Sequence, residues 1–435
     1  MIRKPEPMHY RTEYLRLKSA LHDPATGLPA YPLLVNELQS RLDARRQIGV
    51  LHVGMSGLPL VESLYGWQTL DRILSRVAAG LTAMVGDVLP EGSMLSVNAV
   101  AGDRFIIFIP KIPGSLEVDA GQLATIGVTV AERLESQFDD DEFAGLNPRL
   151  GFQVGHALLS ENPYYRFERR IHGSVEEARN REERLEQSRD RAGADELRRI
   201  IEDSDVTTLF HPIIDLFTGE TLGHEALARG PRGSIYEMPV SMFAASGPAG
   251  ETAALDRLCR TTALCSCCRM DGLGKLFINV TPQSLSDPEW QSGRIVDLLA
   301  EAALTPGDLV LELSEPDADQ DTAKTAAAIA PLRSRGFGIA LDDVGSGYAS
   351  LATMERLCPD YLKVDGSLIR DIDSHLIKQE ALTSLVQVAG RLGSAVIAEG
   401  VESEAESTAI RDLGVRFGQG FLFAAPGMPG EAAGN

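Results

Sequence analysis

The sequence predicts an α/β protein in which a smaller α/β domain precedes a (β/α)8 barrel. The chain has 435 residues, 44% of them hydrophobic, which suffices for two or three domains with packed cores. After residue 205, eight apolar runs rich in β-branched residues alternate with helix-like stretches, which favours a barrel over an open sheet. A charge-rich segment separates the two parts. We therefore predict a leading helix at 1–22, an α/β domain at 23–173, a charged linker helix at 174–204 and the barrel at 205–435.

The first part of the chain has the pattern of a helix followed by an α/β domain. Apolar residues at three- and four-residue spacing predict a helix over about residues 9–22, which ends at the turn "DPATGLP". An amphipathic segment from Leu33 to Leu42, the strand-like run "IGVLHVGM" and a helix over about residues 69–84 follow. The run "AVAGDRFIIFIP" then predicts a turn and a hydrophobic strand.

Residues 166–203 differ in composition from the segments on either side. Opposite charges recur at helical spacing with few apolar residues among them, which predicts a solvated or interface helix. A plain linker is the simpler interpretation.

Composition excludes two broad classes. The formal net charge of −21 argues against nucleic-acid binding, which depends on clustered lysine and arginine, so an anionic ligand would need local cations. No run of about 18 apolar residues and no signal-peptide pattern occurs, so we expect no membrane span and a cytoplasmic protein.

Four of the five cysteines lie close together in the helix-like segment "DRLCRTTALCSCCRM". A zinc site is one interpretation, but helical geometry turns Cys265, Cys267 and Cys268 to different faces, and no second ligand pair lies at the usual spacing. We interpret these three and Cys259 as buried or semi-buried thiols, with a metal or redox role as the alternative.

The polar residues of the predicted barrel strands fall at their carboxyl ends, which form the active-site rim in such barrels. Singly, each could face water or cap a helix. Together, five carboxylates at one rim would repel one another unless divalent cations were bound, and hard oxygen ligands select magnesium, manganese or calcium. The eight polar residues at the predicted strand ends are Glu225, Asn279, Glu312, Asp342, Asp343, Lys363, Glu399 and Gln419.

The C-terminal half resembles the EAL-domain phosphodiesterases, which hydrolyse cyclic di-GMP to linear pGpG. The signature "HEALARG" is followed in order by "FINVTP", "LELSE", "LDDVGSGYASL", "YLKVDGSLI", "AEGVE" and "GQGFLF". Val344 departs from the usual aromatic residue of "DDFG", Gly230 from a frequent tryptophan and His211 from the glutamine of "QPI". None of these departures removes a predicted ligand, but Val344 leaves the rate and its regulation open.

The resemblance implies two divalent cations, Mg²⁺ or Mn²⁺, with Ca²⁺ inhibitory. Their ligands would be Glu225, Asn279, Glu312, Asp342, Asp343, Glu399 and Gln419. Lys363, Glu399 and Asp343 would act in catalysis, and Arg229, Leu227 and Lys363 would contact the substrate. Glu315, Asp365 and Glu402 would orient the site, with ordinary surface ion pairs as the alternative. A homodimer is also implied.

The N-terminal domain resembles a GGDEF domain that has lost its cyclase chemistry. Gly54 and Ser56 stand where acidic metal ligands are expected, and Arg104 replaces the second acid of the name-giving motif, leaving Asp103. Pro59 and Glu62 replace phosphate- and guanine-binding residues. We therefore predict a phosphodiesterase with an inactive, regulatory or dimerising first domain that could bind a protein partner. The alternatives are a non-catalytic cyclic di-GMP receptor and an interaction scaffold.

Overall fold

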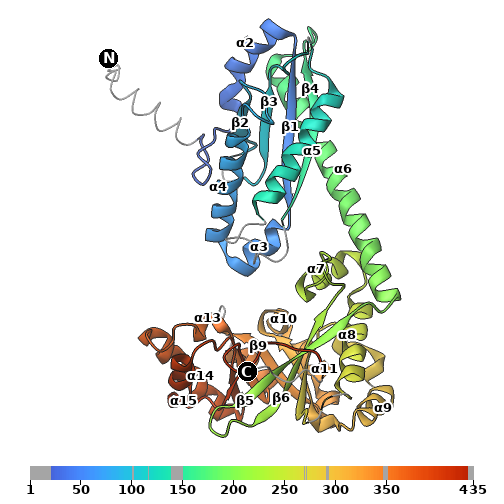
Figure 1. The fold of residues 1–435 in the computed structure, drawn as a ribbon, viewed down its shortest axis with the longest axis vertical. Coiled ribbons are helices and arrows are strands. Elements are labelled where there is room, and N and C mark those ends of the chain that lie inside the picture. The colour runs from blue at the N-terminus through green and yellow to red at the C-terminus, as the bar shows by residue number, and fades with distance from the viewer. Residues whose placement is uncertain are drawn as a thin grey trace, which may run out of the picture. The chain divides into compact units, whose positions relative to one another are not determined.

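The computed structural model divides into two compact units, with the boundary between Gly193 and Ala194 (Figure 1). It describes residues 21–429 except 100–101, 116, 139–149, 269, 271, 291–292 and 346–350. The predicted leading helix at 9–22 therefore lies almost entirely outside the described residues. No helix within the described part of the chain is long and apolar enough to cross a membrane.

The first unit is a four-stranded antiparallel sheet with helices on both faces, in the strand order β2-β3-β1-β4. Inward-facing residues of β1 alternate, so that Leu51, Val53 and Met55 pack on one side and Ile48 and Val50 on the other. The elements are η1 (Tyr31–Leu34), α2 (Val35–Arg45), β1 (Gln47–Ser56), α3 (Leu58–Tyr65), α4 (Trp67–Ala83), β2 (Met94–Val97), β3 (Phe105–Ile109), α5 (Ala120–Gln137) and β4 (Gly151–Ser160). The α/β class predicted for this part is confirmed.

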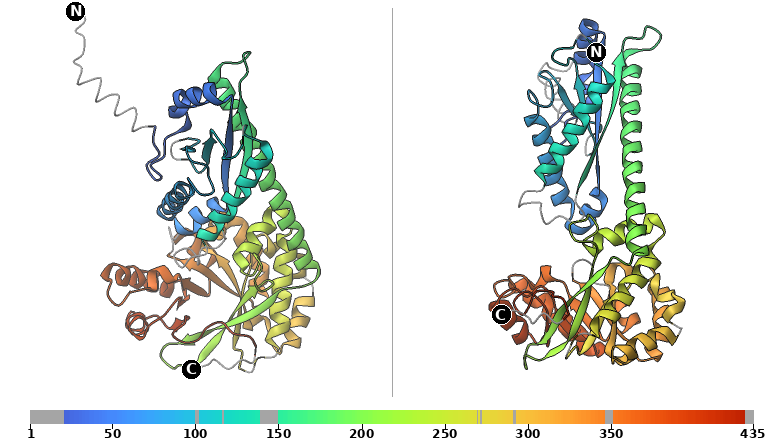
Figure 2. Two further views of the ribbon diagram at one scale, coloured as in Figure 1. Left: turned by 45° about the horizontal axis from the view of Figure 1, so that its top comes forward. Right: turned by 45° about the vertical axis from the view of Figure 1, so that its right-hand side comes forward.

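The charged segment lies within one helix, α6 (Phe167–Glu202). Figure 2 shows the first part of α6 running beside the sheet of the first unit. Phe167, Ile171, Val175 and Ala178 form a buried stripe that packs against this sheet. The interpretation of a plain linker is therefore wrong for this half of the helix, because four apolar residues at helical spacing suffice for a packed face.

The second unit is a closed eight-stranded barrel in the order β10-β11-β12-β5-β6-β7-β8-β9. The strands are β5 (Thr207–Asp215), β6 (Thr221–Arg229), β7 (Lys275–Asn279), β8 (Leu309–Ser314), β9 (Gly338–Val344), β10 (Tyr361–Val364), β11 (Ala395–Ala398) and β12 (Phe417–Gly418). The helices are α7 (Pro239–Ala249), α8 (Thr252–Cys267), α9 (Gly293–Glu301), α10 (Glu315–Gln320), α11 (Thr322–Ser334), α12 (Leu351–Leu357), α13 (Gly366–Ile369), α14 (Leu376–Leu392) and α15 (Glu404–Asp412), with short turns η2 (Ser284–Ser286), η3 (Pro288–Trp290) and η4 (Pro306–Asp308). The predicted barrel is confirmed.

One strand departs from the (β/α)8 pattern. β5 runs antiparallel to both neighbours and joins β6 through a hairpin instead of a helix. Asp215 accepts hydrogen bonds from the backbone N–H groups of Phe217 and Thr218, and Gly219 has a φ of +75°. This tight turn reverses the chain within five residues, whereas a parallel crossover needs a dozen or more.

Candidate metal centre and active site

A buried lysine lies at the centre of the carboxyl-end rim of the barrel. Lys363 on β10 is fully buried, and its Nζ lies within ion-pair distance of four carboxylates. The distances are 2.7 Å to Glu399, 2.9 Å to Glu312, and 3.3 Å to both Glu225 and Asp342. One ammonium therefore faces four carboxyl groups, which leaves an excess of negative charge when all four are ionised.

The two-residue period of the strands brings these side chains together. In five strands an apolar residue of the barrel interior precedes a polar rim residue by two positions, so both point inward. The pairs are Phe277 and Asn279, Val310 and Glu312, Ala340 and Asp342, Ile397 and Glu399, and Phe417 and Gln419. The apolar layer closes the barrel beneath the polar one.

The two adjacent aspartates are placed by a bulge in β9. The pairing of β9 with β10 shifts register, so that Asp342 and Asp343 together oppose Lys363. Asp343 has a left-handed φ of +60°, and Gly345 follows with +95°. β9 continues to Val344, so the strand does not end between the two aspartates. The left-handed backbone conformation at Asp343 changes the direction of its side chain, and aspartate tolerates this conformation better than most residues.

Two acidic triads share one residue. Glu225, Glu312 and Asp342 each place an oxygen within 4.8 Å of the others, as do Asp342, Asp343 and Glu399. Apart from its ion pair with Lys363, the Glu312 carboxylate has no hydrogen-bond donor among the described residues. Buried hard oxygens without donors fit divalent cations, so these residues could hold two of them.

Two amides flank the first triad. The side-chain nitrogens of Asn279 and Gln419 donate to the two oxygens of Glu225, at 3.1 and 2.8 Å. This holds the Glu225 carboxylate in one orientation. The Gln419 Oε1 is buried and makes no hydrogen bond within the described structure, so it also is available to a cation.

The charged groups of this site shift one another's pKa values. Burial, together with neighbouring carboxylates, raises the pKa of Glu312 and of Glu399 well above the usual range. Burial, followed by Asp342 and Asp365, raises the pKa of Asp343 to about 6. Although burial opposes its charge, the surrounding carboxylates raise the pKa of Lys363, which therefore stays protonated. These shifts have the sign expected of a site that lacks positive charge.

The predicted substrate-contacting residues lie at the end of β6. Leu227 is partly buried and pairs with Leu209 across the hairpin. Arg229 is also partly buried, and its Nη1 donates to the backbone oxygen of Ala228 at 2.8 Å. Burial lowers the pKa of Arg229, while Glu225 and Glu237 act in the opposite direction. Arg229 therefore lies within electrostatic reach of the rim.

The three residues predicted to orient the site lie in different surroundings. Glu315 is buried at the start of α10, directly after β8. Asp365 caps α13 by accepting a hydrogen bond from the Ser367 N–H, and its charge acts on Asp343. Glu402 instead forms an exposed ion pair with Arg370 at 3.1 Å, as in the surface alternative.

Sequence reasoning missed a buried ionic network behind β7. Arg260 on α8 is 2% exposed, pairs with Asp256, Asp287 and Glu289, and lies 4.4 Å from the ring of Trp290. Asp256 in turn accepts from the backbone N–H of Thr281, two residues beyond Asn279. The network thus anchors the loop that follows a predicted ligand. The i, i+4 spacing of Asp256 and Arg260 was the available signal.

The cysteine cluster shows no metal-binding group among the described residues. Cys267 is buried, and burial raises its pKa to about 12, as it does for the partly buried Cys259. Cys265 and Cys268 are exposed, so the expectation of buried or semi-buried thiols is wrong for these two.

Comparisons with known proteins give concordant matches. The family model described as the EAL domain matches residues 194–426. The chain is 27% identical over 449 residues to the bifunctional diguanylate cyclase/cyclic di-GMP phosphodiesterase MucR of Pseudomonas aeruginosa, covering 95% of this chain and 61% of MucR. It is 31% identical over 152 residues to the probable cyclic di-GMP phosphodiesterase PdeA of Escherichia coli, covering 35% of this chain and 21% of PdeA. The chain therefore spans only part of the length of these relatives.

A solved structure has the same barrel fold. The EAL domain of Xanthomonas citri FimX, determined in complex with c-diGMP, superposes with a TM-score of 0.52 at 21% sequence identity. The superposition covers 58% of this chain and 100% of that domain. At this identity the likeness establishes the fold alone.

Proposed function

The chain belongs to the EAL domain family, and on that premise we propose that it is a metal-dependent phosphodiesterase that hydrolyses cyclic di-GMP to linear pGpG. The arrangement around Lys363 carries the proposal. Two acidic triads that share Asp342 supply hard oxygen ligands for two cations, next to the ammonium group of Lys363. The names of MucR and PdeA support the choice of substrate.

In this proposal Glu225, Glu312 and Asp342 hold one cation and Asp342, Asp343 and Glu399 the other, with Asn279 and Gln419 contributing carbonyl oxygens. Either Mg²⁺ or Mn²⁺ suits these ligands, and Ca²⁺, with its longer bonds, would inhibit. When bound, such ions polarise a phosphodiester and lower the pKa of water.

The protein's own residues then bind the substrate and carry the proton. Lys363 stays charged, so it acts as a cation that attracts the phosphate and positions the attacking water. Glu399 lies 2.7 Å from the Lys363 Nζ, and its carboxylate is our candidate for the proton acceptor. Arg229 contacts a phosphate from the end of β6, and Leu227 offers an apolar contact.

The first unit acts in this proposal as a regulatory or dimerising module without cyclase activity. Arg104 donates to the Met55 backbone oxygen at 3.1 Å, and Gly54 lies directly beneath Glu182 of α6. This region therefore offers no acidic ligand at residues 54, 56 or 104. On the barrel, the exposed Leu376 and Ile377 at the start of α14 give a second copy of the chain an apolar contact, as a homodimer requires.

The test is hydrolysis of cyclic di-GMP by the purified chain, followed by chromatography of the nucleotide products. We expect linear pGpG with Mn²⁺ or Mg²⁺ and none with EDTA. Glu225→Gln should reduce turnover at least about 100-fold, because it removes a charged ligand. Glu220→Gln, an exposed change just before the same strand, is the matched control and should retain activity.

Calorimetry separates the alternatives. If the wild type binds cyclic di-GMP with micromolar affinity but does not hydrolyse it with any of these metals, the protein is a receptor and not an enzyme. If the protein neither binds nor hydrolyses cyclic di-GMP, the proposal is refuted and the interaction scaffold remains as the alternative.

A further inference from the structure

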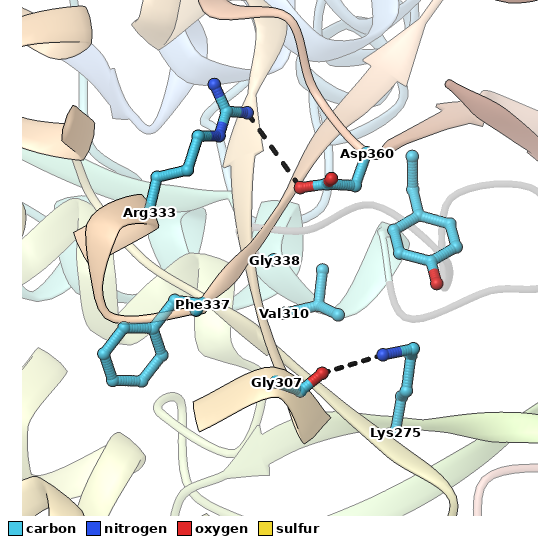
Figure 3. A pocket seen from close by; sticks show the side chains of 9 residues that line it. Lys275, Gly307, Val310, Arg333, Phe337, Gly338 and Asp360 are labelled. Atoms are coloured by element: carbon cyan, nitrogen blue, oxygen red, sulfur yellow. Dashed lines mark hydrogen bonds and ion pairs between the residues drawn. The ribbon is translucent and has the colours of Figure 1, made fainter. Parts of the chain in front are cut away.

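A second opening lies at the amino-terminal mouth of the barrel, opposite the carboxylate rim. It is a cavity of about 330 Å³ (Figure 3). Four of its lining residues come from the beginnings of four adjacent strands, β7 to β10. These residues are Lys275, Val310, Gly338 and Tyr361.

The cavity is built from the same inward-facing rows as the site at the other rim. Lys275 precedes Asn279 by four positions, and Tyr361 precedes Lys363 by two. Between the two layers, the Tyr361 ring stands edge-on to Phe277, with ring centroids 5.2 Å apart. The two mouths are therefore separated by a single apolar layer.

The charges at this mouth favour an anion. The Lys275 Nζ donates to the backbone oxygen of Gly307 at 2.8 Å. Its charge also acts on Asp308, which lies outside the lining. Arg333 lies on the other side of the lining, and Figure 3 shows its guanidinium turned toward Asp360, with the Arg333 Nη2 3.9 Å from the Asp360 Oδ2. The Asp360 carboxylate also accepts a hydrogen bond from the Ile339 N–H at 2.8 Å. The lining thus has net positive charge in a chain of net charge −21.

Both cations are held in place. Arg333 donates to the backbone oxygens of Leu357 and Cys358, at 2.8 and 2.6 Å. Lys275 retains two N–H groups beyond its bond to Gly307. The glycines at 307, 336 and 338 leave the walls without side chains, so a ligand can reach the backbone.

We propose that this mouth binds a small phosphate monoester, with Lys275 and Arg333 holding the phosphate and Tyr361 forming the apolar wall. The volume is that of a small-metabolite pocket, at the lower end of the usual range. A phosphate group matches two separated cationic donors better than a neutral ligand does. The inference does not depend on the function proposed for the other rim.

The experiment is titration calorimetry of the full chain in EDTA with three probes: inorganic phosphate, ribose 5-phosphate and guanosine 5′-monophosphate. EDTA keeps the carboxylate rim free of metal, so that rim repels phosphate. We expect saturable binding of at least one ester, weakened by added NaCl. Lys275→Met should weaken it at least about tenfold, since a charged hydrogen bond is lost. Lys275→Arg should retain binding.

Lys324→Met is the matched control, because Lys324 is an exposed lysine on α11, the helix that carries Arg333. It removes the same charge and should leave the affinity unchanged. Fluorescence of the two tryptophans verifies that each variant is folded. Absence of saturable binding up to about 10 mM for all three probes, or equal binding by folded Lys275→Met, would overturn the proposal. Binding of inorganic phosphate, but of neither ester, would overturn the assignment of a phosphate monoester and would indicate a site for simple anions.

Discussion

Replacing Asp343 with asparagine should stabilise the metal-free protein. The left-handed backbone at this position suits asparagine as well as aspartate, so the change removes charge without adding strain. Burial and the neighbouring acids raise the pKa of Asp343 from 3.8 to about 6, a difference of about two units. At about 1.4 kcal/mol per unit, the ionised form costs the fold up to about 3 kcal/mol, which asparagine relieves.

The sign of the pH dependence follows from the raised pKa. Below about pH 4 the carboxyl is protonated in both the folded and the unfolded chain, so the cost is absent. It grows between about pH 4 and 6 and is complete above about pH 6. The variant should therefore exceed the wild type by about 1–3 kcal/mol at pH 7.5 in EDTA, and by about a third of that amount at pH 4.5. Saturating Mn²⁺ should narrow the gap, because the variant has lost a ligand.

Urea denaturation followed by tryptophan fluorescence measures this difference. The chain has two tryptophans, and Trp67→Phe leaves Trp290 as the only reporter, within the barrel. Asp371→Asn is the matched control, because Asp371 is exposed and also has a positive φ, +56°. A variant no more stable than wild type at pH 7.5, or a gain that is the same at pH 4.5, would refute the reasoning.

Two further predictions concern the barrel rim and the first unit. Lys363→Met should lower kcat with saturating Mn²⁺ at least about 100-fold, because the central ammonium is lost; retained turnover would exclude Lys363 from the reaction. Gly54→Ala should destabilise the first unit by about 1–3 kcal/mol, since an added Cβ would overlap the carboxylate of Glu182. Calorimetric unfolding of Gly54→Ala, Glu182→Ala and the double variant should show that the second change largely removes the cost of the first, whereas additive losses would contradict this packing.

The barrel and its rim could be predicted because both depend on short-range pattern. An apolar residue followed two positions later by a polar one, as in Val310 and Glu312, fixes which side chains point inward and at which end. Placing these strands in order around a closed barrel then brings the polar residues together without knowledge of any loop.

Features that depend on backbone geometry or tertiary packing could not be predicted in this way. The bulge at Asp342 and Asp343 depends on how β9 pairs with β10, which no local pattern reveals. The reversal of β5 depends on the hairpin after Asp215, which interrupts an otherwise regular alternation. The burial of α6 residues such as Val175 depends on a sheet formed by distant segments.

The ammonium of Lys363 has a consequence for how the protein matures. Small zinc domains fold only when the metal arrives, because nothing else brings their ligands together. Here a covalently attached cation already gathers the acidic side chains, so the barrel can be synthesised and kept intact while divalent ions are scarce. Divalent ions can then bind to the folded barrel and dissociate from it reversibly, according to their supply.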